Sequence, residues 1–410
     1  MKKLYIVSLL RGITIGFYAP IWIIYLYNSG YNLFLLGVIG TVFEIMKFIF
    51  EIPSGAISDK FGIKYNLITS FICLSITWFL FPFSSNGMIL IILLLTWTLS
   101  ETLFSGTFES WINQEVRQSE FSRTLFNNTK IFILFIIIIS PLSGFLYKVN
   151  EFLPFVLAAM SSLILTLYLS VFVKIRKNKP HVIEVNDSSI VDIIKNASVT
   201  MLKNKRTLNI IIASFFFAFV IDTIDRYWQP YFKHIYIDEV TFGFVTTLGG
   251  IALLFLLHIF SVFDKQLNQI PEKYNVLITL IAILLILLLL IGKKIVAFFS
   301  VSLVTITDDL MNTLINNALN QEMSDKSTSM ATIFSLNGAS GALGEILSGI
   351  IFGFIILKLG YNLTFVFCSV LLVIPLLLYI YNVKLQNKIL IQKMFKVFGD
   401  RKLGDVFVKS

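Results

Sequence analysis

Twelve apolar stretches, each long enough to cross a lipid bilayer, run through this chain of 410 residues. A spanning helix needs about 20 apolar residues, at a rise of about 1.5 Å per residue. Hydrophobic residues make up 56% of the chain and charged residues only 14%, which excludes an ordinary soluble domain. The sequence therefore predicts an all-α membrane protein with transmembrane helices at 4–28, 33–58, 65–83, 88–112, 126–147, 152–173, 207–232, 240–262, 274–291, 295–319, 329–357 and 361–383.

Charge divides these helices into two classes. The third, sixth, ninth and twelfth contain no Asp, Glu, Lys, Arg or His, whereas each of the others contains at least one. A charge at the bilayer centre costs about 2.5–3.5 kcal/mol on insertion scales, so a helix that carries one usually faces a polar interior. We expect the four uncharged helices to face lipid and the others to line a wet cavity, which indicates transport.

The net charge of +9 is distributed unevenly along the chain. If the N-terminus is cytoplasmic, 24 of the 33 Lys and Arg residues fall in cytoplasmic segments, as the positive-inside rule requires. We therefore expect a multi-pass protein of a bacterial-type cytoplasmic membrane, with both termini in the cytoplasm. The basic excess indicates contact with membrane lipids rather than with nucleic acid.

The longest polar interruption lies in the middle of the chain and predicts four parts. These are an N-terminal six-helix bundle (1–173), a cytoplasmic linker with an amphipathic helix (174–206), a C-terminal six-helix bundle (207–383) and a basic cytoplasmic tail (384–410).

The two bundles resemble each other in sequence. The tripeptide Asn-Gln-Glu that ends the fourth helix recurs at the end of the tenth, 207 residues later, and the same offset places Glu101 on Asp308. Two six-helix halves repeated in parallel are a recurrent plan among transporters.

One loop motif indicates a family. Between the second and third helices lie Gly55, Asp59, Lys60, Gly62 and Lys64 at spacings that resemble the loop signature of the major facilitator superfamily. The resemblance implies two pseudo-symmetric six-helix bundles, and a latch role for this loop in a conformational cycle. Gly62 permits a tight turn and Gly55 a close approach of two helices. We expect the protein to act as a monomer.

Two further segments are similar to those of bacterial exporters in this superfamily, Glu51 to Gly55 and Asp225 to Pro230. Two departures from the exporter pattern are visible. The fourth helix lacks the arginine of many proton-coupled drug antiporters, and the fifth retains only Pro141 and Gly144 of the antiporter pattern. The family resemblance implies proton antiport, whereas these two departures do not support it.

Helix neighbours lie three or four residues apart, so some buried charges can be neutralised within their own helix. Such a cluster is either a structural ion pair or part of a functional site. The two clusters of this kind are Glu44, Lys47 and Glu51 in the second helix, and Asp222, Asp225 and Arg226 in the seventh.

Other charges lack an opposite charge at those spacings and must pair between helices, meet water or lose their charge. The candidates for proton coupling are Glu101, Asp308, Asp309 and Glu109. Glu101 and Asp308 lead, because both lie near the midplane at equivalent positions. The alternative for these two acids is a structural bridge to Arg11 or Lys130.

Aromatic side chains on the first and seventh helices are candidates to stack on an apolar or cationic ligand. With the charged residues of the same region they form the predicted substrate cavity. Its candidate residues are Arg11, Tyr18, Trp22, Asp222, Asp225, Arg226 and Trp228.

No nucleotide-binding loop, metal-spaced His or Cys cluster or nucleophile elbow is present in the sequence, so we expect neither an enzyme nor a bound cofactor or metal. The sequence favours proton-coupled efflux of a small amphipathic or cationic compound by alternating access. Two alternatives stay open, which are proton-linked uptake of a small nutrient or anion, and a transporter-like receptor that moves no solute.

Overall fold

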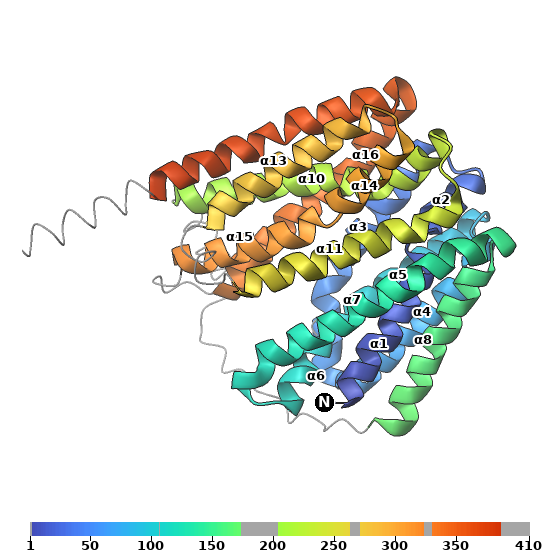
Figure 1. The fold of residues 1–410 in the computed structure, drawn as a ribbon. Coiled ribbons are helices and arrows are strands. Elements are labelled where there is room, and N and C mark those ends of the chain that lie inside the picture. The colour runs from blue at the N-terminus through green and yellow to red at the C-terminus, as the bar shows by residue number, and fades with distance from the viewer. Residues whose placement is uncertain (1, 106, 174–203, 263–270, 324–329, 387–410) are drawn as a thin grey trace, which may run out of the picture.

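The computed structural model describes residues 2–105, 107–173, 204–262, 271–323 and 330–386, and this part of the chain is almost entirely helical. We call residues 2–173 the first half and residues 204–386 the second half. Figure 1 shows the two halves side by side as bundles of long helices. The predicted linker and tail lie outside the described residues, apart from short stretches at their edges.

The helix bounds are as follows. The first half contains α1 (Lys2–Tyr18), α2 (Trp22–Asn28), α3 (Leu33–Phe61), α4 (Ile63–Leu80), η1 (Phe81–Phe83), α5 (Gly87–Phe104), α6 (Thr107–Glu115), α7 (Gln118–Val149) and α8 (Leu153–Phe172). The second half contains α10 (Lys205–His234), η2 (Glu239–Thr241), α11 (Phe242–Val262), α13 (Pro271–Leu289), α14 (Lys294–Val304), α15 (Thr307–Met323) and α16 (Met330–Leu371), after which the chain is helical over 373–386.

Eleven segments of the described chain are long and apolar enough to cross a membrane. The last, Asn337–Gln386, has 50 residues, about twice what one span needs. Gly360 interrupts it with φ 80° and ψ 175°, a conformation that glycine adopts without steric penalty. The break divides the segment into the predicted eleventh and twelfth helices, and the twelve-helix architecture is confirmed.

Four predicted helices are each interrupted, and one of them is the twelfth, at Leu372. The first span breaks between Tyr18 and Trp22, because Pro20 has no N–H and its ring clashes with the preceding turn. The fourth breaks at Ser105, whose ψ of 133° leaves the helical path. The tenth breaks at a β-branched run, where the Thr307 hydroxyl donates to the Val304 carbonyl at 2.6 Å and competes with the backbone ladder.

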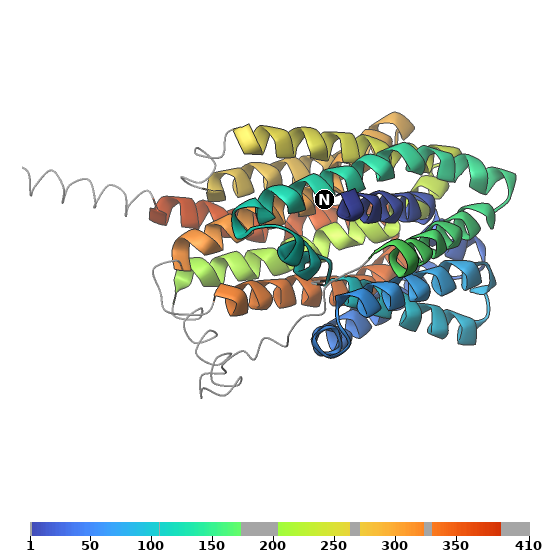
Figure 2. The same cartoon turned by 90° about the horizontal axis from the view of Figure 1, so that it is seen from below.

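The halves meet along two helix pairs at one end of the molecule, which we call the closed end. In the first pair, α3 lies against α16, and a Cβ on Gly37 would overlap the carbonyl oxygen of Gly349. In the second pair, α7 lies against α11, and the Thr247 hydroxyl donates to the Ile137 carbonyl at 2.9 Å. Figure 2 shows α7 and α11, teal and yellow, running together. Glycine thus allows backbone contact across this seam.

A third contact at the closed end repairs the break in the first span. Gln229 of α10 is 1% exposed, and its side-chain amide donates to the Ala19 carbonyl at 3.1 Å and accepts from the Ile24 N–H at 2.9 Å.

Lys148 and Asp238 form an ion pair of 2.7 Å at the rim of the closed end, which lowers the pKa of the Asp238 carboxyl. The ribbons diverge toward the other end, the open end, where the described chain begins and ends (Figure 1).

The four uncharged helices lie on the outside, as predicted. Each has a row of exposed large apolar side chains, for example Ile76 and Phe79 on α4 and Leu280 and Leu284 on α13. Their opposite faces pack into the cores of the halves, with α4 against α8 and α13 against α16. Apolar surface without hydrogen-bonding groups is suited to contact with lipid tails.

A buried ion pair holds the open end of the second half together. Glu272, at the start of α13, is fully buried, and its Oε1 lies 2.5 Å from Nε of Arg206 in α10. Asn382 donates to the Arg206 carbonyl at 3.2 Å and so ties the twelfth helix to the same point.

The first prediction concerns the glycine seam. Gly37→Ala places a methyl group against the Gly349 backbone, and overpacking of this kind costs about 1–3 kcal/mol, which is enough to shift a conformational equilibrium roughly tenfold. Spin labels at the exposed Met88 and Ile295 of the closed end report the separation of the halves by pulsed electron resonance. We expect a longer-distance population in the variant. Gly87→Ala, where a Cβ meets nothing within 4 Å, is the control and should leave the distances unchanged.

The second prediction concerns the buried pair. Removing one member of a buried ion pair costs about 3–5 kcal/mol, because the other charge stays in an apolar site. We expect Glu272→Gln to lower the apparent melting temperature of the purified protein clearly, whereas Glu151→Gln at an exposed position should not. Equal melting temperatures for both variants would show that the Arg206 contact contributes nothing to stability.

Candidate functional site

A cavity of about 660 Å³ lies between the two halves, which is within the range of small-molecule sites. Its walls come from α2, α3, α5 and α7 of the first half and from α10, α11 and α15 of the second. Among the described residues, none from α4, α8, α13 or the helix after Gly360 lines it. The uncharged helices are therefore separated from the cavity, as their composition predicted.

The second-half wall carries most of the charge. Asp222, Asp225 and Arg226 are three and four residues apart on α10, so all three reach the same face. Asp309 of α15 joins them in the lining. Asp225 and Asp309 are solvent-exposed, and within the described structure neither carboxylate has a hydrogen bond or ion pair. The wall thus presents two carboxylates with no bonded counter-charge.

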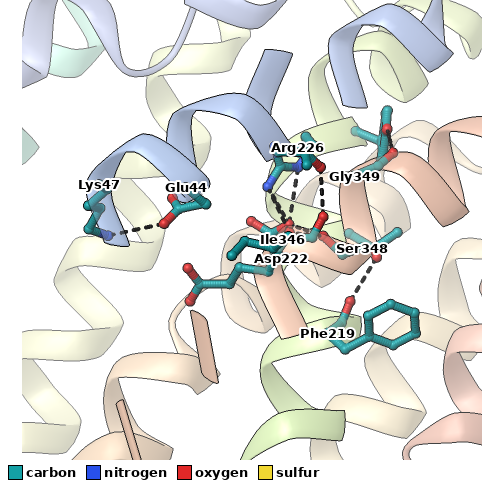
Figure 3. Close-up of polar contacts among 12 residues, drawn as sticks. Glu44, Lys47, Phe219, Asp222, Arg226, Ile346, Ser348 and Gly349 are labelled. Carbon is teal, nitrogen blue, oxygen red and sulfur yellow. Dashed lines mark hydrogen bonds and ion pairs between the residues drawn. The ribbon is translucent and has the colours of Figure 1, made fainter. Parts of the chain in front are cut away.

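Asp222 is neutralised by its own helix. The Arg226 Nη2 lies 2.6 Å from the Asp222 Oδ2, and the Ser348 hydroxyl of α16 donates to the same oxygen (Figure 3). Arg226 is 7% exposed and reaches the first half, where a Cβ on Gly40 of α3 would overlap its guanidinium group. Asp222 and Arg226 therefore form a structural pair that also borders the cavity.

The predicted cluster on α3 is brought together in part. Lys47 Nζ lies 3.4 Å from the Glu44 Oε2, and Glu44 lines the cavity (Figure 3). Glu345 of α16 is close enough for its charge to interact with both residues. The side chain of Glu51 is outside the described part of the structure.

The first-half wall is aromatic. Trp22, Phe43 and Trp97 line the cavity, with ring centres 5.0 Å apart for Trp22 and Trp97 and 4.6 Å apart for Phe43 and Trp97. Tyr18 stacks on Trp78 at 3.7 Å behind them and is not a lining residue. In the second half, Trp228 also lines the cavity and packs on Phe232 and Phe242.

Arg11 lies away from this cavity, in a smaller pocket of about 180 Å³ within the first half. Its Nη2 lies 3.0 Å from the Glu101 Oε2, and its guanidinium carbon is 4.1 Å from the centre of the Phe104 ring. Glu109 borders the same pocket. This bridge is the structural alternative that the sequence left open for Glu101.

The predicted coupling residues are thus dispersed. Glu101 is bonded to Arg11, the Asp308 carboxylate accepts from Asn312 at 2.9 Å, and Glu109 lies in the smaller pocket. Of the four acids, only Asp309 lines the central cavity.

The predicted latch is described in part. Gly62 has φ 88°, which confirms the tight turn between α3 and α4, and Lys64 donates to the Ser170 carbonyl at 2.9 Å. Gly55, Asp59 and Lys60 fall in α3, but their side chains are not described.

Sequence reasoning missed several residues of the site, including Phe43, Trp97 and Ser348. Trp97 lies one turn before Glu101, so it shares a helix face with a charge that the sequence singled out. Ser348 lies three residues after Glu345 and shares a face with that acid. Gln229 lies within the exporter-like segment Asp225 to Pro230, but its bonds to the first half could not be predicted, because they depend on the break in another helix. Among the described residues, no group of three or more His, Cys, Asp or Glu could hold a metal ion.

Comparison with known proteins finds a matching family and a related transporter. The sequence model of the Major Facilitator Superfamily matches residues 4–344. The chain is 35% identical over 407 residues to "Uncharacterized MFS-type transporter YxaM" of Bacillus subtilis (strain 168), covering 97% of this chain and 100% of that protein.

Solved structures show the same fold at low identity. A crystal structure of a variant of the nucleoside transporter NupG superimposes with a TM-score of 0.75 at 13% identity, covering 93% of this chain and 99% of that one. An inward-facing bacterial homolog of the human lysosomal transporter Spinster gives 0.72 at 12% identity, covering 94% and 97%. The sequence model and the relative from Bacillus subtilis show that the chain belongs to the major facilitator superfamily of membrane transporters.

Proposed function

We propose that this transporter exports a small amphipathic or cationic compound from the cytoplasm in exchange for protons. The observation that carries the proposal is the pair of carboxylates, Asp225 and Asp309, that line the cavity without a bonded counter-charge. Negative charge in a partly dehydrated cavity attracts a cation, and aromatic rings opposite it suit an apolar body.

The distribution of basic residues supports an orientation in which the open end is cytoplasmic. Lys64, Arg123 and Lys273 belong to the open end, and the sequences predicted to form the cytoplasmic linker and tail are rich in Lys and Arg. By the positive-inside rule we infer that this end faces the cytoplasm, and the cavity lining extends toward it through Thr129, Leu257 and Thr313. Export then requires the seam at the closed end to separate while the open end closes.

A proton and an organic cation would compete for the same carboxylates. Asp225 interacts electrostatically with Asp222, Asp308, Asp309 and Glu345, so this region gathers negative charge. Binding either a proton or a cationic substrate relieves the repulsion, and exclusive binding of one or the other is what exchange requires. We assign coupling to Asp309 and Asp225, because the Arg11 bridge already compensates the charge of Glu101.

Uptake of an anion, the alternative from sequence, receives less support from this lining. Among the described lining residues the basic one is Arg226, and its charge is already paired with Asp222. Accumulation of a probe in cells with and without the protein distinguishes the two directions, since an exporter lowers it and an importer raises it.

The third prediction tests proton coupling. In proteoliposomes with an acidic lumen, we expect uptake of tetraphenylphosphonium to exceed that of protein-free vesicles, because protons leaving the lumen drive entry of the cation. Nigericin with equal potassium on both sides collapses the pH gradient and should return uptake to the protein-free level. Uptake that persists after this collapse would contradict coupling to protons.

The fourth prediction separates the carboxylates. Asp309→Asn removes a charge from the cavity, so we expect uptake driven by the pH gradient to fall roughly tenfold or more, as for the loss of a charge-assisted contact. Glu101→Gln should retain a larger share of transport and instead lower the melting temperature, because it breaks the Arg11 bridge. Full activity of Asp309→Asn combined with inactivity of a folded Glu101→Gln would reverse the assignment. Glu151→Gln is the control at an exposed position.

A further inference from the structure

The two walls of the central cavity differ in chemistry, and each wall belongs to a different half. The first half contributes Trp22, Phe43, Trp97 and Phe132, four aromatic side chains on four helices. The second half contributes one aromatic side chain, Trp228, and the lining carboxylates without a bonded partner, Asp225 and Asp309.

The aromatic wall is held rigidly. Trp22 and Trp97 meet edge to face with an interplanar angle of 89°, and Trp97 also meets Trp78 at 5.0 Å. Trp78 is fully buried and stacks on Tyr18. Rings fixed in this way present a surface to a ligand at little further cost in side-chain entropy.

The remaining charges of the cavity are compensated within the protein. Glu44 is paired with Lys47 at 3.4 Å, and Asp222 with Arg226 at 2.6 Å. A ligand cation is therefore directed to Asp225 and Asp309 on the second half. Its apolar body is directed to the rings of the first half, because the two surfaces face the same space.

We propose that the substrate is a monovalent organic cation with an aromatic body, held with its rings against Trp22 and Trp97 of the first half and its charge beside Asp225 and Asp309 of the second. A charge delocalised over a large apolar group suits this site, since it loses little hydration on binding and attracts aromatic faces. Such a ligand connects the halves and senses their relative position. This inference rests on the proposed export function and specifies how the site divides recognition.

Three probes separate the two contributions in equilibrium binding to the purified protein, where no gradient or transport is involved. Tetraphenylphosphonium is aromatic and cationic, tetrabutylammonium is cationic without rings, and triphenylphosphine oxide is aromatic and neutral. We expect tetraphenylphosphonium to bind most tightly, because it alone engages both walls.

Variants of each wall should then affect different probes. Trp22→Leu is expected to lower the affinity for tetraphenylphosphonium roughly three- to tenfold, as for the loss of an aromatic contact. The affinity for tetrabutylammonium should stay within about twofold of its original value. Trp22→Phe should restore most of the affinity. Asp225→Asn, Asp309→Asn and their combination should weaken both cations, the double variant roughly tenfold or more, and leave the neutral probe within about twofold.

The control is Glu151→Gln, an exposed acid that lines neither pocket, which should change no affinity. Melting temperatures confirm that each variant is folded. If every variant lost affinity for all three probes equally, the division between walls would be overturned, while the proposal of cation export would still stand. If none of the three probes binds the folded protein, the proposed substrate class fails, and the division of the cavity fails with it.

Discussion

Inside a membrane, a backbone N–H or C=O group without a hydrogen-bond partner costs several kcal/mol, and this penalty governs the structure. It explains why the described chain is built of helices. It also requires that backbone groups at each helix break find another hydrogen-bond partner. At Pro20 the first span loses its ladder, and the side-chain amide of Gln229 supplies the missing donor and acceptor from the other half. Where threonine interrupts the tenth span, hydroxyl groups bond nearby carbonyls instead.

The same penalty shapes the contact between the halves. Lipid tails are as apolar as leucine side chains, so apolar surface alone does not drive two bundles together in a membrane. The seam uses close backbone approach at Gly37 and Gly349 and hydroxyl bonds such as the one from Thr41 to the Ile346 carbonyl at 2.7 Å. Contacts of this kind are many and individually weak. The seam can therefore keep the halves together at the closed end and still allow them to separate there.

The architecture could be predicted from sequence, because span length and charge content are local signals. The separation of uncharged helices from the cavity followed from the energetics of charge in lipid. The partners of individual charges could not be predicted in the same way. Whether Glu101 meets Arg11 or the cavity depends on the rotation of two helices about their axes, and a change of one residue turns a side chain by about 100°. Asp222 and Asp225 differ for that reason, although they lie one turn apart.

The bond between Gln229 and the broken first span has a consequence for the speed of the cycle. When the halves part at the closed end, the Ala19 carbonyl and the Ile24 N–H lose their partner, and each group left unsatisfied costs about 1–3 kcal/mol. Water is the available replacement, since no other side chain of the described structure bonds either group. Water must therefore enter this helix break when the halves separate. The barrier to outward opening then contains a hydration step, and the rate of opening falls when water activity falls.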